Sequence, residues 1–236
     1  MIEVQDASKR RGGRLLWHGL SFRVDPGEVL ALRGTSGSGK STLLDCIGHL
    51  DTLDAGRIII DGRTAGGNAR RARHIRRDLL GYLFQDFGLV PDLSVTANIE
   101  LALPGPRHRV GTAPSVTAAL RSVGLDGRGP DRAHELSGGE QQRVALARLL
   151  VKQPRVVLAD EPTSALDDTN AELVLTHLEA MAAAGAAIVL ATHADAVSSR
   201  ADRSLTLTSA NRPDAQASSS DARVRRCARA RRTGRP

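Results

Sequence analysis

The chain has 236 residues, 41% of them hydrophobic, which is enough for one sizeable α/β domain with a buried core. Most of its net charge of +7 lies in a C-terminal tail. Residues 209–236 carry eight Arg and two Asp, a contribution of +6, which leaves +1 for residues 1–208. We expect this basic tail to be disordered, because it has too little apolar surface to offset the entropy of ordering. The remaining charge gives no sign of nucleic-acid binding.

Composition also argues against a membrane-spanning or secreted protein. The longest nearly continuous apolar stretch, residues 180–191, is shorter than the ~20 residues of a spanning helix. Residues 1–6 carry acids instead of the apolar run of a secretory signal. The two cysteines, Cys46 and Cys227, do not make a disulfide scaffold. We therefore expect a soluble chain in a reducing compartment, which would work at a membrane only through a partner.

Predicted strands and helices alternate along the chain. Alternating apolar and polar residues predict strands with one solvated face near residues 2–4 and 20–24. Apolar or β-branched runs predict further strands at 29–32, 57–60, 81–84, 155–159, 187–191 and 205–207. Helices are expected at 41–50, in the Arg-rich stretch 63–78, over much of 86–150 and at 170–183. This alternation indicates an α/β fold with a mostly parallel sheet.

A glycine-rich segment, GTSGSGKST, lies between the strand predicted at 29–32 and the helix predicted at 41–50. It matches the P-loop pattern, in which backbone N–H groups and the positive end of a helix bind phosphates. Lys40, one of only three lysines, would contact the β- and γ-phosphates, and Ser41 would bind Mg²⁺. The predicted nucleotide-binding residues are Gly34, Thr35, Ser36, Gly37, Ser38, Gly39, Lys40, Ser41 and Thr42. The alternative is a surface loop that happens to be rich in Gly and Ser.

Two acids follow the buried strand predicted at 155–159. Asp160 stands at its carboxyl end, where open α/β sheets bind ligands, and would hold Mg²⁺ through water. Glu161 comes next and is the candidate general base for the attacking water. The alternative is an ordinary solvated turn before Pro162. A P-loop requires a carboxylate on a neighbouring strand, which favours the functional interpretation.

Residues 136–143, LSGGEQQR, resemble the LSGGQ signature of ATP-binding-cassette ATPases, with Glu140 in place of the usual Gln. Ser137, Gly138 and Gly139 would open a helix whose N–H groups, dipole and hydroxyl form a second anion site without a lysine. The resemblance implies that this site closes over the γ-phosphate of ATP held by the P-loop of another subunit, in a homodimer. A plain N-capped amphipathic helix is the alternative.

Three more segments match this family in its expected order. Gln85 corresponds to the glutamine that senses Mg²⁺ and the nucleophilic water, and residues 164–167 to the D-loop that contacts the opposite subunit. His193 corresponds to the switch histidine at the γ-phosphate, although a lone His after a strand is more often structural. The resemblance covers residues 1–208 and implies an ATP-hydrolysing enzyme with ATP and Mg²⁺. The implied fold is a RecA-like P-loop NTPase core with a mostly parallel sheet, an N-terminal antiparallel β subdomain and an inserted helical subdomain over about residues 86–150.

Finer similarity, within residues 48–58 and 84–100, is to the macrolide-export and lipoprotein-release ATPases, which energise a separate membrane permease. It implies that the chain powers export or lipoprotein release. It also implies a cytoplasmic location, peripheral at the inner face of the membrane. The implied docking contacts with the permease are Phe87, Leu89 and Val90.

One departure from the family concerns the adenine ring. The family usually stacks an aromatic residue on the base a few residues into the chain, and Arg11 stands at that place. A planar guanidinium can stack on a base, and Trp17 is the other candidate.

Alternative functions remain open at this stage. A nucleic-acid-associated cassette is supported only by the basic tail, and one Trp, one Tyr and three Phe are poor material for stacking on bases. A regulatory cassette that does not hydrolyse ATP agrees with Arg11 but not with Glu161 and His193. The tail itself is either a tether to anionic lipid or nucleic acid, or an extension without function, which is the simpler interpretation.

Overall fold

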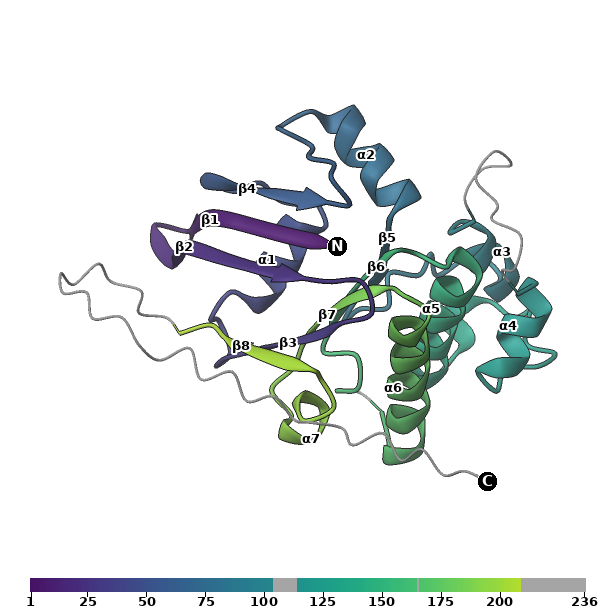
Figure 1. Cartoon of the computed structure of the whole chain (residues 1–236). Coiled ribbons are helices and arrows are strands. Elements are labelled where there is room, and N and C mark those ends of the chain that lie inside the picture. Colours follow the sequence, from purple (N-terminus) through teal and green to yellow (C-terminus); the bar gives the residue numbers. More distant parts are fainter. Residues whose placement is uncertain (104–113, 165, 209–236) are drawn as a thin grey trace, which may run out of the picture.

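A computed structural model describes residues 1–103, 114–164 and 166–208 of the chain (Figure 1). Five strands form one sheet in the order β5-β6-β7-β3-β8, and every neighbouring pair is parallel. These strands are β3 (Val29–Arg33), β5 (Leu80–Leu83), β6 (Val156–Asp160), β7 (Ala187–Ala191) and β8 (Arg203–Thr206). The α/β class and the parallel sheet expected from the sequence are confirmed.

The strands of this sheet supply two hydrophobic cores, one on each face. In β3, Leu30 and Leu32 enter one core, whereas Val29 and Ala31 enter the other. β7 is buried along its whole length. Burial on both faces explains why these strands read as continuous apolar runs instead of alternating ones.

The first core lies beneath a second, antiparallel sheet with the order β2-β1-β4. Its strands are β1 (Ile2–Arg11), β2 (Arg14–Val24) and β4 (Ala55–Ile60). Helix α1 (Lys40–Ile47) buries Leu43, Leu44 and Ile47 in this core, together with side chains from both sheets. The expected N-terminal antiparallel unit is therefore present, and α1 joins it to the parallel sheet.

The second core lies under helices that follow β5. They are α3 (Val95–Glu100), α4 (Val116–Ser122), the 3₁₀ helix η1 (Ala133–Glu135), α5 (Gly138–Lys152) and α6 (Asp168–Ala183). Helix α5 is central, because its buried side chains Val144, Leu146 and Leu149 belong to this core. Helices α3 and α4 lie beyond α5, away from the antiparallel sheet (Figure 1). The helical insertion expected over about residues 86–150 corresponds to α3, α4, η1 and most of α5, whereas α6 follows it in the chain.

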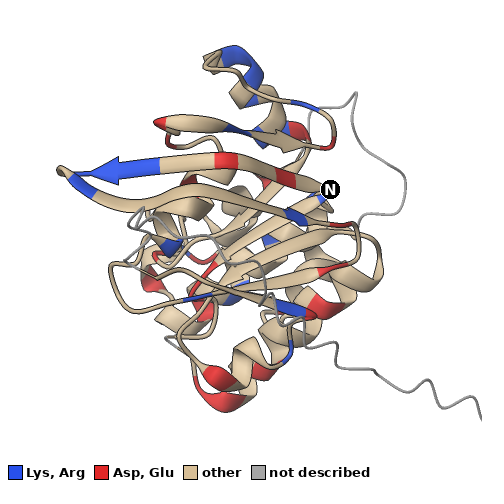
Figure 2. Cartoon of the chain, turned by 60° about the vertical axis from the view of Figure 1, so that its left-hand side comes forward, with Lys and Arg blue, Asp and Glu red and all other residues tan. Residues whose placement is uncertain are grey.

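Two further helices lie at the periphery. α2 (Ala69–Asp78) buries Ala72 and Ile75, and its sequence is rich in Arg, as the blue segments of this helix in Figure 2 show. Its N-terminus is capped by Asn68, whose side chain accepts a hydrogen bond from the backbone of Arg71. α7 (Asp195–Ser198) follows β7. Across the residues that the structure describes, no helix combines the length and the apolar character needed to cross a bilayer.

Helix α1 is shorter than expected from the sequence. It ends at Ile47 instead of continuing to residue 50, and His49 takes a left-handed conformation with φ 53°. The N–H groups of Leu50 and Asp51 both bind the carbonyl of Asp45, so the chain turns away from the helix axis. The prediction of a longer helix was wrong because apolar spacing does not reveal a left-handed residue. The division at residue 208 remains a prediction, because residues 209–236 lie outside the described part.

The sharpest backbone constraint between β1 and β4 is Gly56, and it gives a first prediction. A Cβ on Gly56 would lie 2.5 Å from the carbonyl oxygen of Gln5 and closer still to that of Asp6, at φ 85°. We expect Gly56→Ala to lower the free energy of unfolding by roughly 2–4 kcal/mol. Gly62→Ala is the control, because Gly62 also has a positive φ but no atom within 4 Å of its Cβ position. Chemical denaturation measures the free energy of unfolding of both variants. An equal loss of stability in the two would contradict the role proposed for the close contact between Gly56 and the carbonyl oxygens of β1.

Candidate nucleotide-binding site

The glycine-rich loop connects β3 to α1. Lys40, the first residue of α1, folds its side chain back over the loop, and its Nζ donates to the carbonyl oxygens of Gly34 (2.9 Å) and Thr35 (3.4 Å). A Cβ on Gly34 would lie 2.5 Å from the Ser38 Oγ, so only glycine allows this turn. Gly39 has φ 95°, and its Cβ would lie 2.9 Å from the Nε1 atom of Trp17. The loop is therefore held tightly around an ammonium group.

The N-terminus of α1 is free of competing groups. Its N-cap, Gly39, has no side chain, and its first turn contains no acid. The first N–H groups and the positive end of the helix dipole are therefore left to an anion. Together with Lys40, this arrangement matches the electrostatics of a phosphate.

Asp160 lies beside this loop at the end of β6. Burial raises the pKa of its carboxyl, and a hydrogen bond from the side chain of Ser41 opposes that effect. The Oδ1 atom of Asp160 is buried and has no hydrogen-bond partner within the described part of the chain. An unpaired carboxylate oxygen next to a hydroxyl suits a hard cation such as Mg²⁺. No group of three His, Cys, Asp or Glu side chains among the described residues could hold a metal ion.

Glu161 and His193 meet at the same edge of the sheet. The backbone N–H of Glu161 donates to the carbonyl of Ala191 at 3.0 Å, and its φ of 45° is left-handed, which is strained for a non-glycine residue. The Nδ1 atom of His193 lies 2.9 Å from the Oε1 atom of Glu161. The structure thus joins the two predicted residues in one hydrogen bond, with the imidazole largely exposed.

Gln85 lies in an exposed turn directly after β5. The turn continues through Phe87, which has φ 65°, and the guanidinium of Arg148 on α5 donates to the carbonyl of Phe87. Further along, Asn98 is fully buried, accepts from the N–H of Val90 and donates to its carbonyl. The expected docking segment is therefore a well-braced turn.

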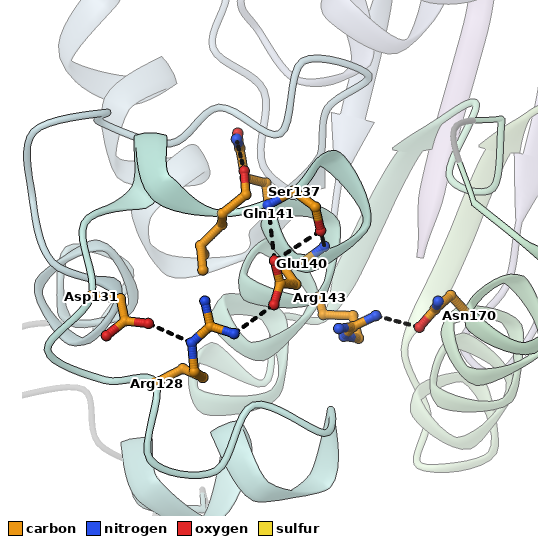
Figure 3. Close-up of polar contacts among 8 residues, drawn as sticks. Arg128, Asp131, Ser137, Glu140, Gln141, Arg143 and Asn170 are labelled. Atoms are coloured by element: carbon orange, nitrogen blue, oxygen red, sulfur yellow. Dashed lines mark hydrogen bonds and ion pairs between the residues drawn. The ribbon is translucent and has the colours of Figure 1, made fainter.

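The signature residues open α5 (Figure 3). Ser137 is the N-cap, and it forms a capping box with Glu140. The nearest neighbours of Cβ atoms placed on Gly138 and Gly139 would be Phe87 at 3.6 Å and Leu166 at 3.5 Å. The signature of this chain therefore lies against its own turn after β5 and its own D-loop segment, and not against its own phosphate loop. Ala165 of the predicted D-loop is outside the described residues.

The structure separates the two candidates for adenine contact. Trp17 is only 2% exposed and packs behind the phosphate loop, so its ring cannot stack on a bound base in this conformation. Arg11 is exposed, and its guanidinium donates to the Thr42 hydroxyl at 3.3 Å. Arg14, which the sequence analysis missed, also reaches the loop, because its NH1 would lie 3.9 Å from a Cβ on Gly37. The sequence did contain a signal for Arg14. Two glycines separate it from Arg11, and a two-residue hairpin loop of this kind pairs the residues on either side of it, so Arg14 lies opposite Arg11.

A parallel sheet with a phosphate loop after β3 and a carboxylate at the end of β6 defines the class of P-loop nucleoside triphosphatases. The profile of one family, described as ABC transporter, matches residues 17–164. The chain also resembles a solved dimeric ATP-binding cassette, MJ0796 bound to ADP and Pi, with a TM-score of 0.79 and 32% identity over 89% of this chain and 95% of that one. The chain belongs to the ABC transporter family. It is an ATP-binding cassette, and hence an ATPase that binds ATP.

Curated relatives are longer proteins. The macrolide export ATP-binding/permease protein MacB of Escherichia coli is 37% identical over 213 residues, which are 88% of this chain and 33% of the relative. The pyoverdine export ATP-binding/permease protein PvdT of Pseudomonas entomophila is 38% identical over 214 residues, 86% of this chain and 32% of the relative. The chain thus spans about a third of the length of the curated relatives it matches.

The position of Arg14 gives a second prediction. We expect Arg14→Ala to weaken the binding of a fluorescent ATP analogue about two- to fivefold, because a positive charge beside the phosphate loop is lost. Arg10→Ala is the control, since Arg10 is an exposed residue of the same sheet whose side chain reaches no residue of the loop in the described structure. Equal affinity of the Arg14 variant and the parent protein would exclude a role of Arg14 in nucleotide binding.

Proposed function

We propose that the chain is the ATP-hydrolysing subunit of an exporter and powers a separate membrane permease. The observation that carries this proposal is the convergence of Lys40, Asp160, Glu161 and His193 at the carboxyl ends of the adjacent strands β3, β6 and β7. That edge is where open α/β sheets bind their ligands. The groups there are those needed to bind a triphosphate and activate a water.

Each side chain has a role in this proposal. Lys40 and the loop 34–42 bind the β- and γ-phosphates, and Ser41 and Asp160 hold Mg²⁺, which would neutralise charge on the phosphate oxygens when bound. Glu161 is the general base, and His193 contacts the γ-phosphate and orients the Glu161 carboxylate.

Two other groups complete the proposed site. Gln85 senses the cation and the attacking water from its turn after β5. Arg11 would stack on the adenine, and its hydrogen bond to the Thr42 hydroxyl beside the phosphate loop supports this role.

The proposed active unit is a homodimer. In this proposal Ser137, Gly138, Gly139 and Glu140 would form the second nucleotide-binding segment, which lies away from the phosphate loop of its own chain. A second copy would bring the two together, so that each ATP lies between the loop of one chain and the signature of the other. The dimeric state named for the MJ0796 cassette supports this arrangement.

The proposed partner is an integral membrane permease, as the names of the export relatives suggest. The permease would dock on the turn after Gln85, where Val90 is 44% exposed and Phe87 and Leu89 are half-buried. This interaction would hold the cassette peripherally at the cytoplasmic face of the membrane. Contact of the basic tail with anionic lipid also remains a proposal, since residues 209–236 are not described. Nothing in the fold or the relatives favours the nucleic-acid alternative.

Replacing Glu161 tests the catalytic assignment. We expect Glu161→Gln to reduce phosphate release by at least ~100-fold, because the amide cannot accept a proton, while ATP binding is retained. With ATP and Mg²⁺, this variant should accumulate as a dimer in light scattering. Glu100→Gln, at an exposed position on α3, is the matched control and should behave as the parent protein. Normal turnover by the Glu161 variant would remove Glu161 from its role.

Replacing Val90 tests the docking surface. We expect Val90→Glu to abolish co-purification with a permease encoded beside this chain, because a carboxylate would be buried in an apolar contact. ATP hydrolysis by the isolated cassette should be unchanged. Leu101→Glu, at another exposed apolar residue (65% exposed), is the control and should keep the complex. Loss of the complex with the control but not with Val90→Glu would move the docking surface to α3.

A further inference from the structure

The signature segment of this chain carries a negative charge at Glu140. Glu140 stands where a neutral Gln is usual, and in the dimer proposed above the N-terminus of α5 would face the triphosphate bound to the partner. A carboxylate at this place repels phosphates, and the repulsion strengthens as water is excluded. The proposed nucleotide sandwich, in which each ATP lies between the two chains of the dimer, therefore requires a group that offsets the charge of Glu140. This inference rests on the proposed function.

Glu140 is directed back onto the cap of its own helix (Figure 3). Its Oε2 atom accepts hydrogen bonds from the Ser137 N–H at 2.9 Å and from the Ser137 hydroxyl at 2.8 Å. These hydrogen bonds, first of all the one from the backbone, lower the pKa of Glu140, so the group is charged at neutral pH. The second oxygen, Oε1, accepts from Arg128 NH1 at 2.6 Å. Both oxygens of the carboxylate are thus engaged within the chain.

Arg128 reaches Glu140 from the turn that precedes η1. Its guanidinium also pairs with Asp131, through Nε, so that one cation lies between two carboxylates. The turn is closed by a hydrogen bond from the N–H of Asp131 to the carbonyl of Arg128 at 3.2 Å. The carbonyl of Asp131 in turn accepts from the N–H of Val95, the first residue of α3, at 2.9 Å. The backbone of Arg128 is therefore tied to its own turn and, through Asp131, to the start of α3, and its side chain is engaged by two carboxylates.

We propose that Arg128 is a positioning residue for the signature of this ATPase. By pairing with Glu140 it cancels the charge that this residue adds, and it holds the carboxylate on Ser137, so that the N-terminus of α5 can receive the γ-phosphate of ATP bound to the partner. Arg128 itself need not touch the nucleotide. It is the counterpart that makes a glutamate compatible with this place in the signature.

A different role for Arg128 would be purely structural. Its pair with Asp131 could brace the loop between α4 and η1, in which case the charge of Glu140 would be irrelevant to dimer formation. The two roles predict different behaviour when Glu140 is made neutral.

The experiment uses the full chain carrying Glu161→Gln, which keeps ATP intact. The ATP concentration for half-maximal dimer formation with Mg²⁺ is measured by light scattering at low and high salt. At low salt, we expect Arg128→Gln to raise this concentration about three- to fivefold. The difference should shrink at high salt. Adding Glu140→Gln to Arg128→Gln should restore a value within about twofold of the parent, because no charge is then left uncompensated.

Three controls distinguish charge compensation at Glu140 from a purely structural role of Arg128. Asp131→Asn, which removes only the other partner of Arg128, should leave dimer formation unchanged. Binding of a fluorescent ATP analogue to the monomer should be the same in all variants, because Arg128 lies outside the phosphate loop. Glu140→Gln alone should lower the ATP concentration for dimer formation, since Arg128 then has no charge to cancel at the signature. This last variant tests the proposal even if Arg128→Gln does not fold.

The outcomes are distinct. A double variant as defective as Arg128→Gln, an equal defect in Asp131→Asn, or a higher ATP requirement in Glu140→Gln would overturn the proposal. So would an Arg128→Gln variant that dimerises like its parent. If the Glu161→Gln parent does not dimerise with ATP at all, the sandwich of the proposed function fails and this inference fails with it. If the parent dimerises and the Arg128 results are negative, only this inference is overturned.

Discussion

The functional site depends on the register of three adjacent parallel strands. Leu32 of β3 pairs with Ala191 of β7, and Ala191 pairs with Asp160 of β6. Because parallel strands end at one edge of a sheet, the phosphate loop, His193 and Glu161 follow these residues at the same level. This register alone brings together the backbone of Glu161 and the carbonyl of Ala191, which lie thirty positions apart in the chain. The strands set the position of the site, and the phosphate loop and the N-terminus of α1 supply its phosphate-binding groups.

The same edge holds several groups in conditions that a folded protein normally avoids. Asp160 keeps a buried oxygen without a partner, and so does Ser38 in the phosphate loop, within the described part of the chain. Glu161 is strained at φ 45°, and the hydrogen bonds of the Lys40 ammonium in the described part of the chain go to carbonyl oxygens of the loop. Such features cost free energy unless a ligand satisfies them. These unpaired and strained groups lie where a triphosphate and a cation would bind. Their positions therefore agree with a ligand that satisfies them.

Sequence and structure agree most where the signal is local. The parallel strands, the P-loop and the cap at Ser137 follow from apolar runs, glycine spacing and an N-cap residue, all of which act within a few residues. The contact between Glu161 and His193 depends on strand order, which a single sequence does not reveal. The burial of Trp17 behind the phosphate loop, and the approach of Arg14 to that loop, depend on how the hairpin of β1 and β2 packs over α1. These contacts depend on packing between segments far apart in the chain, which local sequence patterns do not reveal.

The signature segment and the sheet edge that carries Glu161 are connected by direct contacts. The Gln142 side chain donates to the carbonyl of Pro162 at 3.0 Å inside the protein, directly after Glu161. Arg148, whose pKa is lowered by burial to about 10 but which stays charged at neutral pH, donates to the carbonyl of Phe87. One helix, α5, therefore bears on the turn that follows Gln85 and on the segment that carries Glu161. Under the proposed function, a permease that moved this turn would bias closure of the nucleotide sandwich. By thermodynamic reciprocity, ATP binding would then bias the permease to the same extent.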